Sequence, residues 1–213
     1  MIFKDRKHAG QELAKKLIEY SNKPDTIVVA LPRGGVVLGY EVAKELNLPL
    51  DIVVPRKIGA PENEEFAIGA ISEEGDFVKN IEAGEFDKKY IDDEIVKEKE
   101  EAKRRLETYR PGMRKRDFNS KAILLVDDGI ATGLTMLAAI KTLKNMKARK
   151  IIVAVPVSAD DSFEKTKKEV DEIITLDKPV FFGAVGQFYE TFDQTEDDEV
   201  VDLMQKANKL YEI

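Results

Sequence analysis

The feature that most constrains the fold is the segment at residues 123–135, which reads ILLVDDGIATGLT. Four apolar residues lead into two aspartates, and a turn rich in glycine and threonine follows. The next stretch, MLAAIKTLKNM, has apolar residues at helical spacing. The pattern predicts a buried strand, a loop and a helix in direct succession, which is the repeating unit of α/β folds with a mostly parallel sheet.

The composition of this loop suits a phosphorylated sugar. Glycines allow a backbone to approach an anion closely, and the start of a helix offers unpaired N–H groups. Thr132 and Thr135 add hydroxyl donors. Asp127 and Asp128, at the carboxyl end of the strand, can accept hydrogen bonds from vicinal hydroxyls or hold a hydrated divalent cation. We therefore expect a phosphate in the loop and a sugar beside the two acids.

A strand that ends in two acids and a glycine turn could instead be a simple helix-capping junction. For the four residues VDDG alone, that interpretation is the better one. The longer run, with adjacent acids and Thr-Gly-x-Thr, exceeds what a cap requires, so we favour a binding site. A Walker-type phosphate loop is excluded because the chain lacks its Gly-Lys-Ser/Thr here. A phospho-receiver domain would carry its paired acids near its start.

The balance of charge limits the kinds of partner. The 213 residues carry a net charge of −7, whereas nucleic acids and acidic membranes require a clustered positive surface. We therefore expect no nucleic acid and no membrane as partner, and a cytoplasmic protein, because no signal-peptide pattern or long apolar stretch is present. With no cysteine and one histidine, His8, thiolate and multi-histidine metal sites are excluded. His8 is predicted to be an exposed helix residue.

Short apolar runs alternate with helical patterns along the chain. Strands are predicted at residues 26–31, 50–54, 122–126, 151–155 and 173–176, the last at a sheet edge. Helices are predicted at residues 6–20, 36–46, 86–109, 134–146, 160–169 and 197–211. Ser158 and Thr195 are the expected N-caps of the last two. The stretch 56–76 is rich in turn residues and is predicted to hold a mobile loop and a short hairpin.

This order of elements predicts one α/β domain over residues 1–213. Its twisted, mostly parallel sheet should have helices on both faces. The terminal segments, about residues 1–20 and 178–213, are expected to form a small hood lobe over the carboxyl edge of the sheet.

Two further loops place positive charge after predicted strands. Arg33, Gly34 and Gly35 lie between a strand and a helix, so their backbone can approach an anion. Arg56 and Lys57 follow the next strand. Taken singly, the first loop could be a plain tight turn and the second a pair of solvated charges. Together they supply the positive field that an anionic ligand needs in an acidic chain.

An aromatic segment stands near the end of the chain. Five of the sixteen aromatic residues fall within twelve positions, at Phe181, Phe182, Phe188, Tyr189 and Phe192. Core packing could explain some of them. The others could form a hood, because a planar nucleobase packs well against an aromatic face. We expect Tyr189 to be the first base contact, with Phe182 and Phe192 beside it.

Taken together, the segments FKDRKHAGQELA, LPRGG, RKIGAP and VDDGIATGLTM resemble the type I phosphoribosyltransferases, within a branch of predicted phosphoribosyltransferases. The resemblance implies that Asp127 and Asp128 bind the ribose hydroxyls of phosphoribosyl pyrophosphate (PRPP). It assigns the 5-phosphate to the loop residues Gly129, Ile130, Ala131, Thr132, Gly133, Leu134 and Thr135. It assigns the pyrophosphate to Arg33, Gly34, Gly35, Arg56 and Lys57.

The same resemblance carries further expectations. Members of the family often have a cis peptide in the pyrophosphate loop, which here would be the Pro32 to Arg33 bond. Residues 59–70 would be the flexible loop that closes over PRPP. This chain has Ala131 where many members carry an acid proposed to contact the base, a replacement also found in adenine-type members.

The reaction implied is transfer of the 5-phosphoribosyl group from PRPP to a nitrogenous base or related heterocycle, with release of pyrophosphate. Mg²⁺ is the implied cofactor, with Asp127 and Asp128 as its ligands, directly or through water. These two acids and Arg33 are then the catalytic candidates. Two alternatives stay open: the domain could be a sensor that binds PRPP or a nucleotide without turnover, or its main reaction could be hydrolysis or pyrophosphorolysis of a nucleotide. Assembly into a homo-oligomer also stays open.

Overall fold

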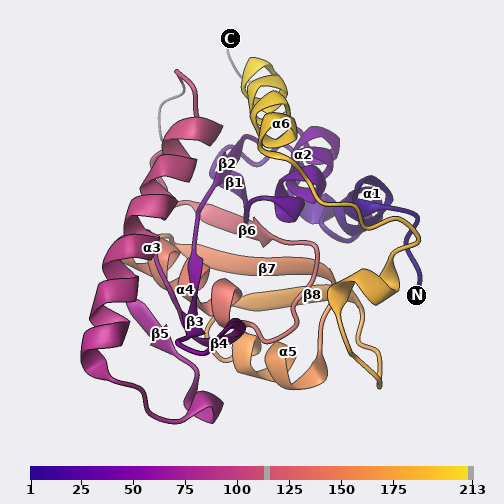
Figure 1. Cartoon of the computed structure of the whole chain (residues 1–213). Helices are drawn as coiled ribbons and strands as arrows, with labels where there is room; N and C mark the ends of the chain where they lie inside the picture. Colours follow the sequence, from indigo (N-terminus) through magenta and orange to yellow (C-terminus); the bar gives the residue numbers. More distant parts are fainter. Residues whose placement is uncertain (113–115, 211–213) are drawn as a thin grey trace.

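The computed structural model describes residues 1–112 and 116–210, and its centre is a sheet of five parallel strands (Figure 1). The strand order is β2-β1-β6-β7-β8, and every neighbouring pair is parallel. The strands are β1 (Thr26–Ala30), β2 (Leu50–Ile52), β6 (Ala122–Val126), β7 (Lys150–Val157) and β8 (Glu172–Asp177). The predicted α/β fold is confirmed, and β8 lies at the predicted edge.

Each central strand is buried on both faces. In β1, Val28 and Ala30 belong to one hydrophobic cluster, whereas Ile27 and Val29 belong to a second cluster on the other side of the sheet. A strand covered on both sides has no solvent face, which is why it reads as a continuous apolar run rather than as an alternating one.

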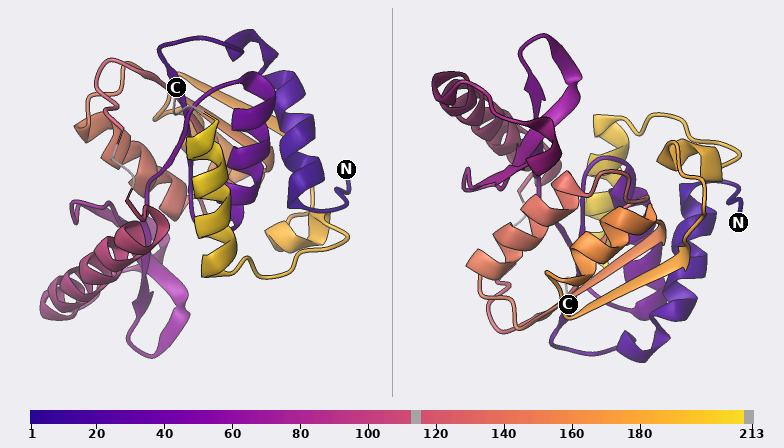
Figure 2. Two further views of the ribbon diagram at one scale, coloured as in Figure 1. Left: turned by 90° about the horizontal axis from the view of Figure 1, so that it is seen from above. Right: turned by 90° about the horizontal axis from the view of Figure 1, so that it is seen from below.

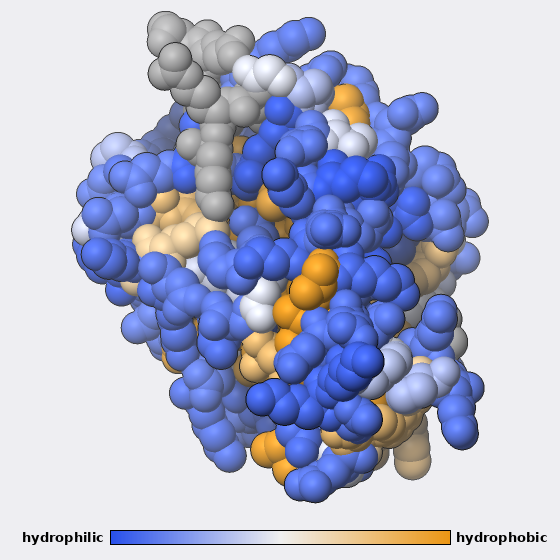
Figure 3. Space-filling model, turned by 60° about the vertical axis from the view of Figure 1, so that its left-hand side comes forward, coloured by the Kyte–Doolittle hydropathy of each residue, from blue (hydrophilic) through white to orange (hydrophobic). Residues whose placement is uncertain are grey.

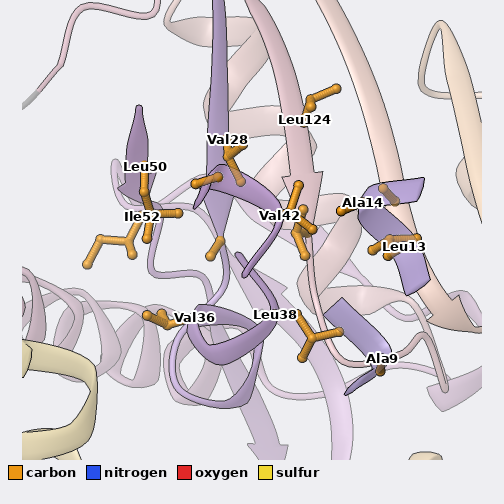
Figure 4. Packing of buried hydrophobic residues seen from close by; sticks show 14 of the residues in the cluster. Ala9, Leu13, Ala14, Val28, Val36, Leu38, Val42, Leu50, Ile52 and Leu124 are labelled. Carbon is orange, nitrogen blue, oxygen red and sulfur yellow. The ribbon is translucent and has the colours of Figure 1, made fainter. Parts of the chain in front are cut away.

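Helices cover both faces of the sheet, as predicted. The first cluster includes residues of α1 (Arg6–Lys16), α2 (Gly34–Leu46) and α6 (Asp197–Lys209), and Figure 4 shows part of this packing. The second cluster includes residues of α4 (Leu134–Asn145). The short helix α5 (Asp160–Lys167) packs against β8. His8 lies in α1 with its side chain partly exposed.

The predicted caps of the last two helices are wrong by one residue. Helix α5 has Ala159 as its N-cap and α6 has Glu196, and neither helix has a side-chain cap bond. Ser158 is buried and donates instead to the carbonyl of Ala159, while Thr195 is also buried. The predicted last residue of the terminal helix, Tyr211, lies outside the described residues.

A second, antiparallel sheet projects from the core together with the long helix α3 (Lys88–Tyr109) (Figure 2). Its strands are β3 (Arg56–Ala60), β4 (Asn63–Ile71) and β5 (Phe77–Lys79). The predicted hairpin is confirmed, but the stretch expected to be a loop, residues 59–70, is mostly strand. The reason is tertiary, because Ile58, Ile68 and Ile71 pack against Tyr90 and other residues of α3.

In the part of the chain that the structure describes, short 3₁₀ turns lie at Ile18–Tyr20, Ile81–Ala83 and Val185–Phe188. Among the helices of residues 1–112 and 116–210, none is long and apolar enough to cross a membrane. The face shown in Figure 3 is largely hydrophilic, and its hydrophobic residues gather in small separate patches.

Candidate active site

The strand order creates a crevice between β1 and β6. These strands are neighbours, but the chain leaves β1 toward β2 on one side and leaves β6 toward β7 on the other. The loops at their carboxyl ends therefore diverge, and open α/β sheets bind ligands at such a point. The two loops begin side by side, since the Leu31 amide donates to the Val126 carbonyl at 3.1 Å.

Asp127 and Asp128 follow β6 at this crevice. The carboxylate of Asp127 accepts the amide of Asp128 at 2.8 Å. Both carboxylates lie against the glycines of the neighbouring loop, where a Cβ on Gly35 would come within 2.8 Å of Asp127 Oδ1 and one on Gly34 would collide with Asp128 Oδ2. The predicted acid pair and the predicted glycine pair are thus in contact, and only glycine allows this approach.

The two acids are held in an environment that opposes their charge. Burial, and then the neighbouring charge of Asp128, raises the pKa of Asp127 well above its usual range. Burial also raises the pKa of Asp128, while the guanidinium of Arg6 acts in the opposite direction. A buried carboxylate with a raised pKa gains from any hydrogen-bond donor or cation that a ligand brings.

The loop after the acids has the form of an anion cradle. Gly133 has a left-handed backbone (φ 78°) and is the N-cap of α4, so the first N–H groups of that helix have no partner within it. Thr132 and Thr135 line a pocket of about 180 Å³ with the acid pair. The side chains of Ile130 and Leu134 are buried, and the Ile130 amide already donates to the Val157 carbonyl at 2.9 Å, so Ile130 offers a ligand no free N–H group.

The cis peptide expected between Pro32 and Arg33 is present. Arg33 is the N-cap of α2. Its guanidinium is turned toward the start of α6, where Nη1 lies 3.6 Å from Glu196 and 3.5 Å from Asp197. Arg33 does not line the pocket that contains the acid pair. The structure therefore brings the backbone of this loop to the site but not the predicted side chain.

Arg56 and Lys57 point in different directions because they are successive residues of β3. Lys57 lines the pocket with the two acids. Arg56 instead donates from Nε to Glu98 of α3 at 2.6 Å. Both side chains were predicted to bind a pyrophosphate. The structure brings Lys57 to the site, whereas it holds Arg56 on the opposite side of the strand.

The aromatic residues belong to a covering segment, residues 178–196, that crosses the site. Tyr189 is buried, and its hydroxyl donates to the Asp128 carbonyl at 2.6 Å. Phe192 packs on Tyr189 with ring centres 4.9 Å apart, and Phe182 packs on Phe188 at 5.3 Å. None of the three predicted hood residues lines the small pocket, whereas Val185 does.

The covering segment is joined to the start of the chain. Amides of residues 190 and 191 donate to the carbonyls of Phe3 and Lys4, and the Phe3 amide donates to Phe188. Helices α1 and α6 pack on the sheet as part of the main core. The hood was predicted to include both terminal stretches. The parts of them that reach the acid pair are the first residues of the chain and the covering segment.

Arg6 is a site residue that the sequence did not reveal. Its Nε donates to Asp128 Oδ2 at 2.9 Å, and its Nη1 donates to the Asp193 carbonyl at 2.6 Å. Two adjacent acids that are largely enclosed are stabilised by a nearby cation. The chain has 34 Lys and Arg residues, however, and only the tertiary contact between α1 and the crevice selects Arg6.

A larger groove of about 920 Å³ lies on the other side of the phosphate loop. It shares Ala131 and Thr132 with the small pocket, and its walls come from β5, α4 and α5. Two of its lysines are already in ion pairs with acidic residues of the same groove, Lys144 with Glu169 and Lys165 with Glu82. The acid pair does not line this groove, so we place the candidate active site in the smaller pocket.

Comparison with known proteins decides the family. A family model described as a phosphoribosyl transferase domain matches residues 2–191. The chain belongs to this family. The structure of this phosphoribosyl transferase domain matches the crystal structure of TT1426 from Thermus thermophilus with a TM-score of 0.81, and the two sequences are 38% identical. The match covers 97% of this chain and 99% of that one.

Two other relatives have names that describe related chemistry. A Mycobacterium tuberculosis protein named "Putative phosphoribosyl transferase" is 40% identical over 211 residues, which is 98% of this chain and 47% of that protein. The chain thus spans about half the length of this relative. A Pyrococcus furiosus ribose-phosphate pyrophosphokinase is 39% identical over 69 residues, which is 30% of this chain and 25% of that protein.

Proposed function

We propose that this domain transfers the 5-phosphoribosyl group from PRPP to a nitrogen atom of a heterocyclic base, with release of pyrophosphate. The observation that supports this proposal most strongly is the arrangement of the crevice. Two helices, α2 and α4, begin at the carboxyl ends of adjacent strands, and the acid pair lies between their first residues. PRPP has an anionic group at each end of a sugar diol, which matches two helix N-termini with two carboxylates between them.

Each part of the crevice then has a chemical task. The first N–H groups of α4, with the hydroxyls of Thr132 and Thr135, hold the 5-phosphate. Asp127 and Asp128 accept hydrogen bonds from the ribose hydroxyls. They also favour the positive charge that develops on the ring as the bond to pyrophosphate breaks. Anchoring the phosphate and the sugar holds the anomeric carbon in line with the acceptor nitrogen.

The basic residues differ in how readily they can serve the leaving pyrophosphate. Lys57 already faces the acid pair. Arg33 pairs with Glu196 and Asp197, which are 68% and 40% exposed, and such exposed pairs contribute little, so a pyrophosphate can compete for this guanidinium at small cost. The pair of Arg56 with Glu98 is shorter and more enclosed. We propose that Lys57 and Arg33 act on the pyrophosphate together with the backbone of Gly34 and Gly35, and that Arg56 has a structural role.

The acid pair fits a site in which the protein and the substrate together supply the ligands of Mg²⁺. Among the described residues, no group of three or more His, Cys, Asp or Glu side chains could hold a metal by itself. Mg²⁺ commonly binds through one or two carboxylates, with water and substrate phosphates as its other ligands. Asp127 and Asp128 would be its protein ligands, and the ion would offset the charge of the pyrophosphate.

We propose that the acceptor base enters beneath the covering segment, beside Val185. The pocket of about 180 Å³ is smaller than the ~300–1,000 Å³ typical of small-molecule sites, so the segment has to move to admit both substrates. Tyr189 packs on Phe192 and on Phe3, and Phe182 packs on Phe188. Their part in base binding therefore requires this movement.

The test is release of pyrophosphate from PRPP and Mg²⁺ in the presence of single purines, pyrimidines and related heterocycles. Pyrophosphate formed in proportion to a new ribonucleotide, with one class of acceptor, is the expected result. Asp127→Asn with Asp128→Asn serves as the inactive control. Absence of PRPP binding at millimolar concentration would reject the proposal.

One observation favours a second function, that of a PRPP sensor. The covering segment is fastened over the acid pair by Tyr189, and Arg33 is turned away from the pocket. A protein that only reports PRPP would use such a closed arrangement as its ligand-free state. Saturable PRPP binding without product from any acceptor in the panel would establish the sensor in place of the transferase.

A further inference from the structure

Arg6 contacts three parts of the site, namely Asp128 of the acid pair, the loop at Gly34 and the covering segment. It is the first residue of α1, where Asp5 caps the helix by accepting the His8 amide at 2.7 Å. Its guanidinium binds Asp128 on one edge and the carbonyl of Asp193 on another. The ring of Phe192 lies over the guanidinium carbon at 3.8 Å.

The contact with Asp128 is enclosed, which makes it stronger than a surface ion pair, whereas the bond to the Asp193 carbonyl is exposed. The side chains of Arg6 and Asp128 are only 13% and 17% exposed. A Cβ on Gly34 would come within 2.6 Å of Arg6 Nε, so the pyrophosphate loop also packs against this guanidinium. A planar guanidinium fixed by a carboxylate, a carbonyl and an aromatic ring has little freedom left, and it fixes the carboxylate in return.

The pairing leaves Asp128 able to bind a sugar. An ionised carboxylate has about four acceptor positions, and Arg6 Nε uses one of them. Asp128 lines the small pocket while it is paired. The ion pair therefore orients the carboxylate without consuming it, and it balances one of two adjacent buried negative charges.

The same guanidinium also links the acid pair to the covering segment. Asp193 and Phe192 belong to that segment, and its Tyr189 hydroxyl reaches the backbone of Asp128. Arg6 therefore connects the Asp128 carboxylate to Phe192 and Asp193 of the covering segment.

We propose that Arg6 is a positioning residue, which orients Asp128 for the ribose hydroxyls and couples occupancy of the ribose position to the packing of residues 189–193. This inference rests on the proposed function, because it takes the ribose of PRPP as the ligand of Asp128. It assigns Arg6 no direct contact with the pyrophosphate. Loss of Arg6 should therefore affect sugar-containing ligands selectively.

The experiment compares three ligands by calorimetry in the presence of Mg²⁺: PRPP, ribose 5-phosphate and pyrophosphate. Relative to the wild type, Arg6→Ala should weaken ribose 5-phosphate and PRPP by about tenfold or more, and pyrophosphate by less than about twofold. Arg6→Lys, which keeps the charge but loses the planar fork, should recover part of the loss. Lys7→Gln is the matched control, because Lys7 is the exposed next residue of the same helix.

A second readout tests the coupling. Hydrogen exchange of the amides of residues 185–193 should slow when ribose 5-phosphate binds to the wild type, and this slowing should be absent in Arg6→Ala at a saturating ligand concentration. Phe192→Leu keeps the ion pair and removes the ring that lies over it. It should reduce the slowing while lowering ribose 5-phosphate affinity less than Arg6→Ala does.

The outcomes separate this inference from the function on which it rests. If the wild type binds none of the three ligands, the proposed function fails and the inference fails with it. If the wild type binds PRPP and ribose 5-phosphate, equal affinity in Arg6→Ala would overturn the inference alone. An equal loss for all three ligands would also overturn it, since general damage to the fold and not positioning of Asp128 would explain the result.

Discussion

The junction between β6 and α4 and the covering segment, residues 178–196, border the same pocket but depend on different kinds of contact. All five residues of β6 pair with β1 on one side and with β7 on the other. The covering segment is held over the pocket by main-chain bonds to Phe3 and Lys4, by the Tyr189 hydroxyl and by Arg6. The first region is paired on both sides within the sheet, whereas the second lies outside the sheet and enters the core with Phe188 and Tyr189.

This difference suggests how the site divides its work. Elements with many buried contacts open only with global unfolding, while segments held by few contacts move at low free-energy cost. On the proposed function, the phosphate and ribose positions would therefore be fixed in advance. The acceptor side would have to open, and its exposed residues, such as Phe181, could vary without loss of the core.

The largest expected effect tests the fixed region. Replacing Asp127 and Asp128 together with Asn should weaken ribose 5-phosphate binding by about a hundredfold, because two charge-assisted acceptors are lost. The fold should persist, because both side chains lie beyond the end of β6 and Asn has nearly the same shape as Asp. Calorimetry measures the first quantity and urea unfolding the second. Unchanged binding would show that the junction is only a structural turn.

Lys57 sharpens the comparison, because it reaches the fixed region from a separate sheet. Lys57→Ala should weaken pyrophosphate binding by about tenfold, since it removes a cation from the pocket wall. Arg56→Ala is the matched control from the same strand, and it should leave pyrophosphate affinity within about twofold because Arg56 faces Glu98. Calorimetric titration with pyrophosphate separates them. A larger loss in the Arg56 variant would reverse our assignment of the two side chains.

Arg33 lies in the loop before α2 that contacts the acid pair, and it pairs with Glu196 at the end of the covering segment, so it connects the two regions. Arg33→Ala should weaken pyrophosphate binding by only about threefold, since the free side chain first has to leave its acidic partners. Glu196→Gln removes one of these partners and should tighten pyrophosphate binding slightly. The same titration tests both variants. A loss as large as that of Lys57→Ala would show that Arg33 is already available to the ligand.

The fixed region is also the one that the sequence predicted well. Residues 122–126 were predicted to be a strand and form β6 with those limits, because an apolar run followed by polar turn residues is a local signal. The contact between the glycines after β1 and the acids after β6 follows from the parallel pairing of those strands. The Pro32 to Arg33 cis bond was expected from the family resemblance and not from the residues alone.

What the sequence did not predict depends on partners distant along the chain. Residues 59–70 look like a loop because glycine, proline and charged residues dominate, and they become strand by packing against α3. The opposite directions of Arg56 and Lys57 follow once β3 is known to be a strand. Arg6 has no local signal, since its role arises only where α1 meets the crevice.

The smallest expected effect tests the movable region. Tyr189→Phe removes the hydroxyl that donates to the Asp128 carbonyl and keeps the buried ring, so it should lower the free energy of unfolding by about 1 kcal/mol. Phe181→Ser, in the same segment but 90% exposed, should change it by less than about 0.5 kcal/mol. Urea unfolding measures both.

Tyr189→Phe should leave ribose 5-phosphate affinity within about twofold, because the bond reaches the backbone of Asp128 and not its carboxylate. A loss approaching that of the double Asn variant would show that the covering segment is part of the ribose site itself, and the division between a fixed and a movable region would have to be abandoned.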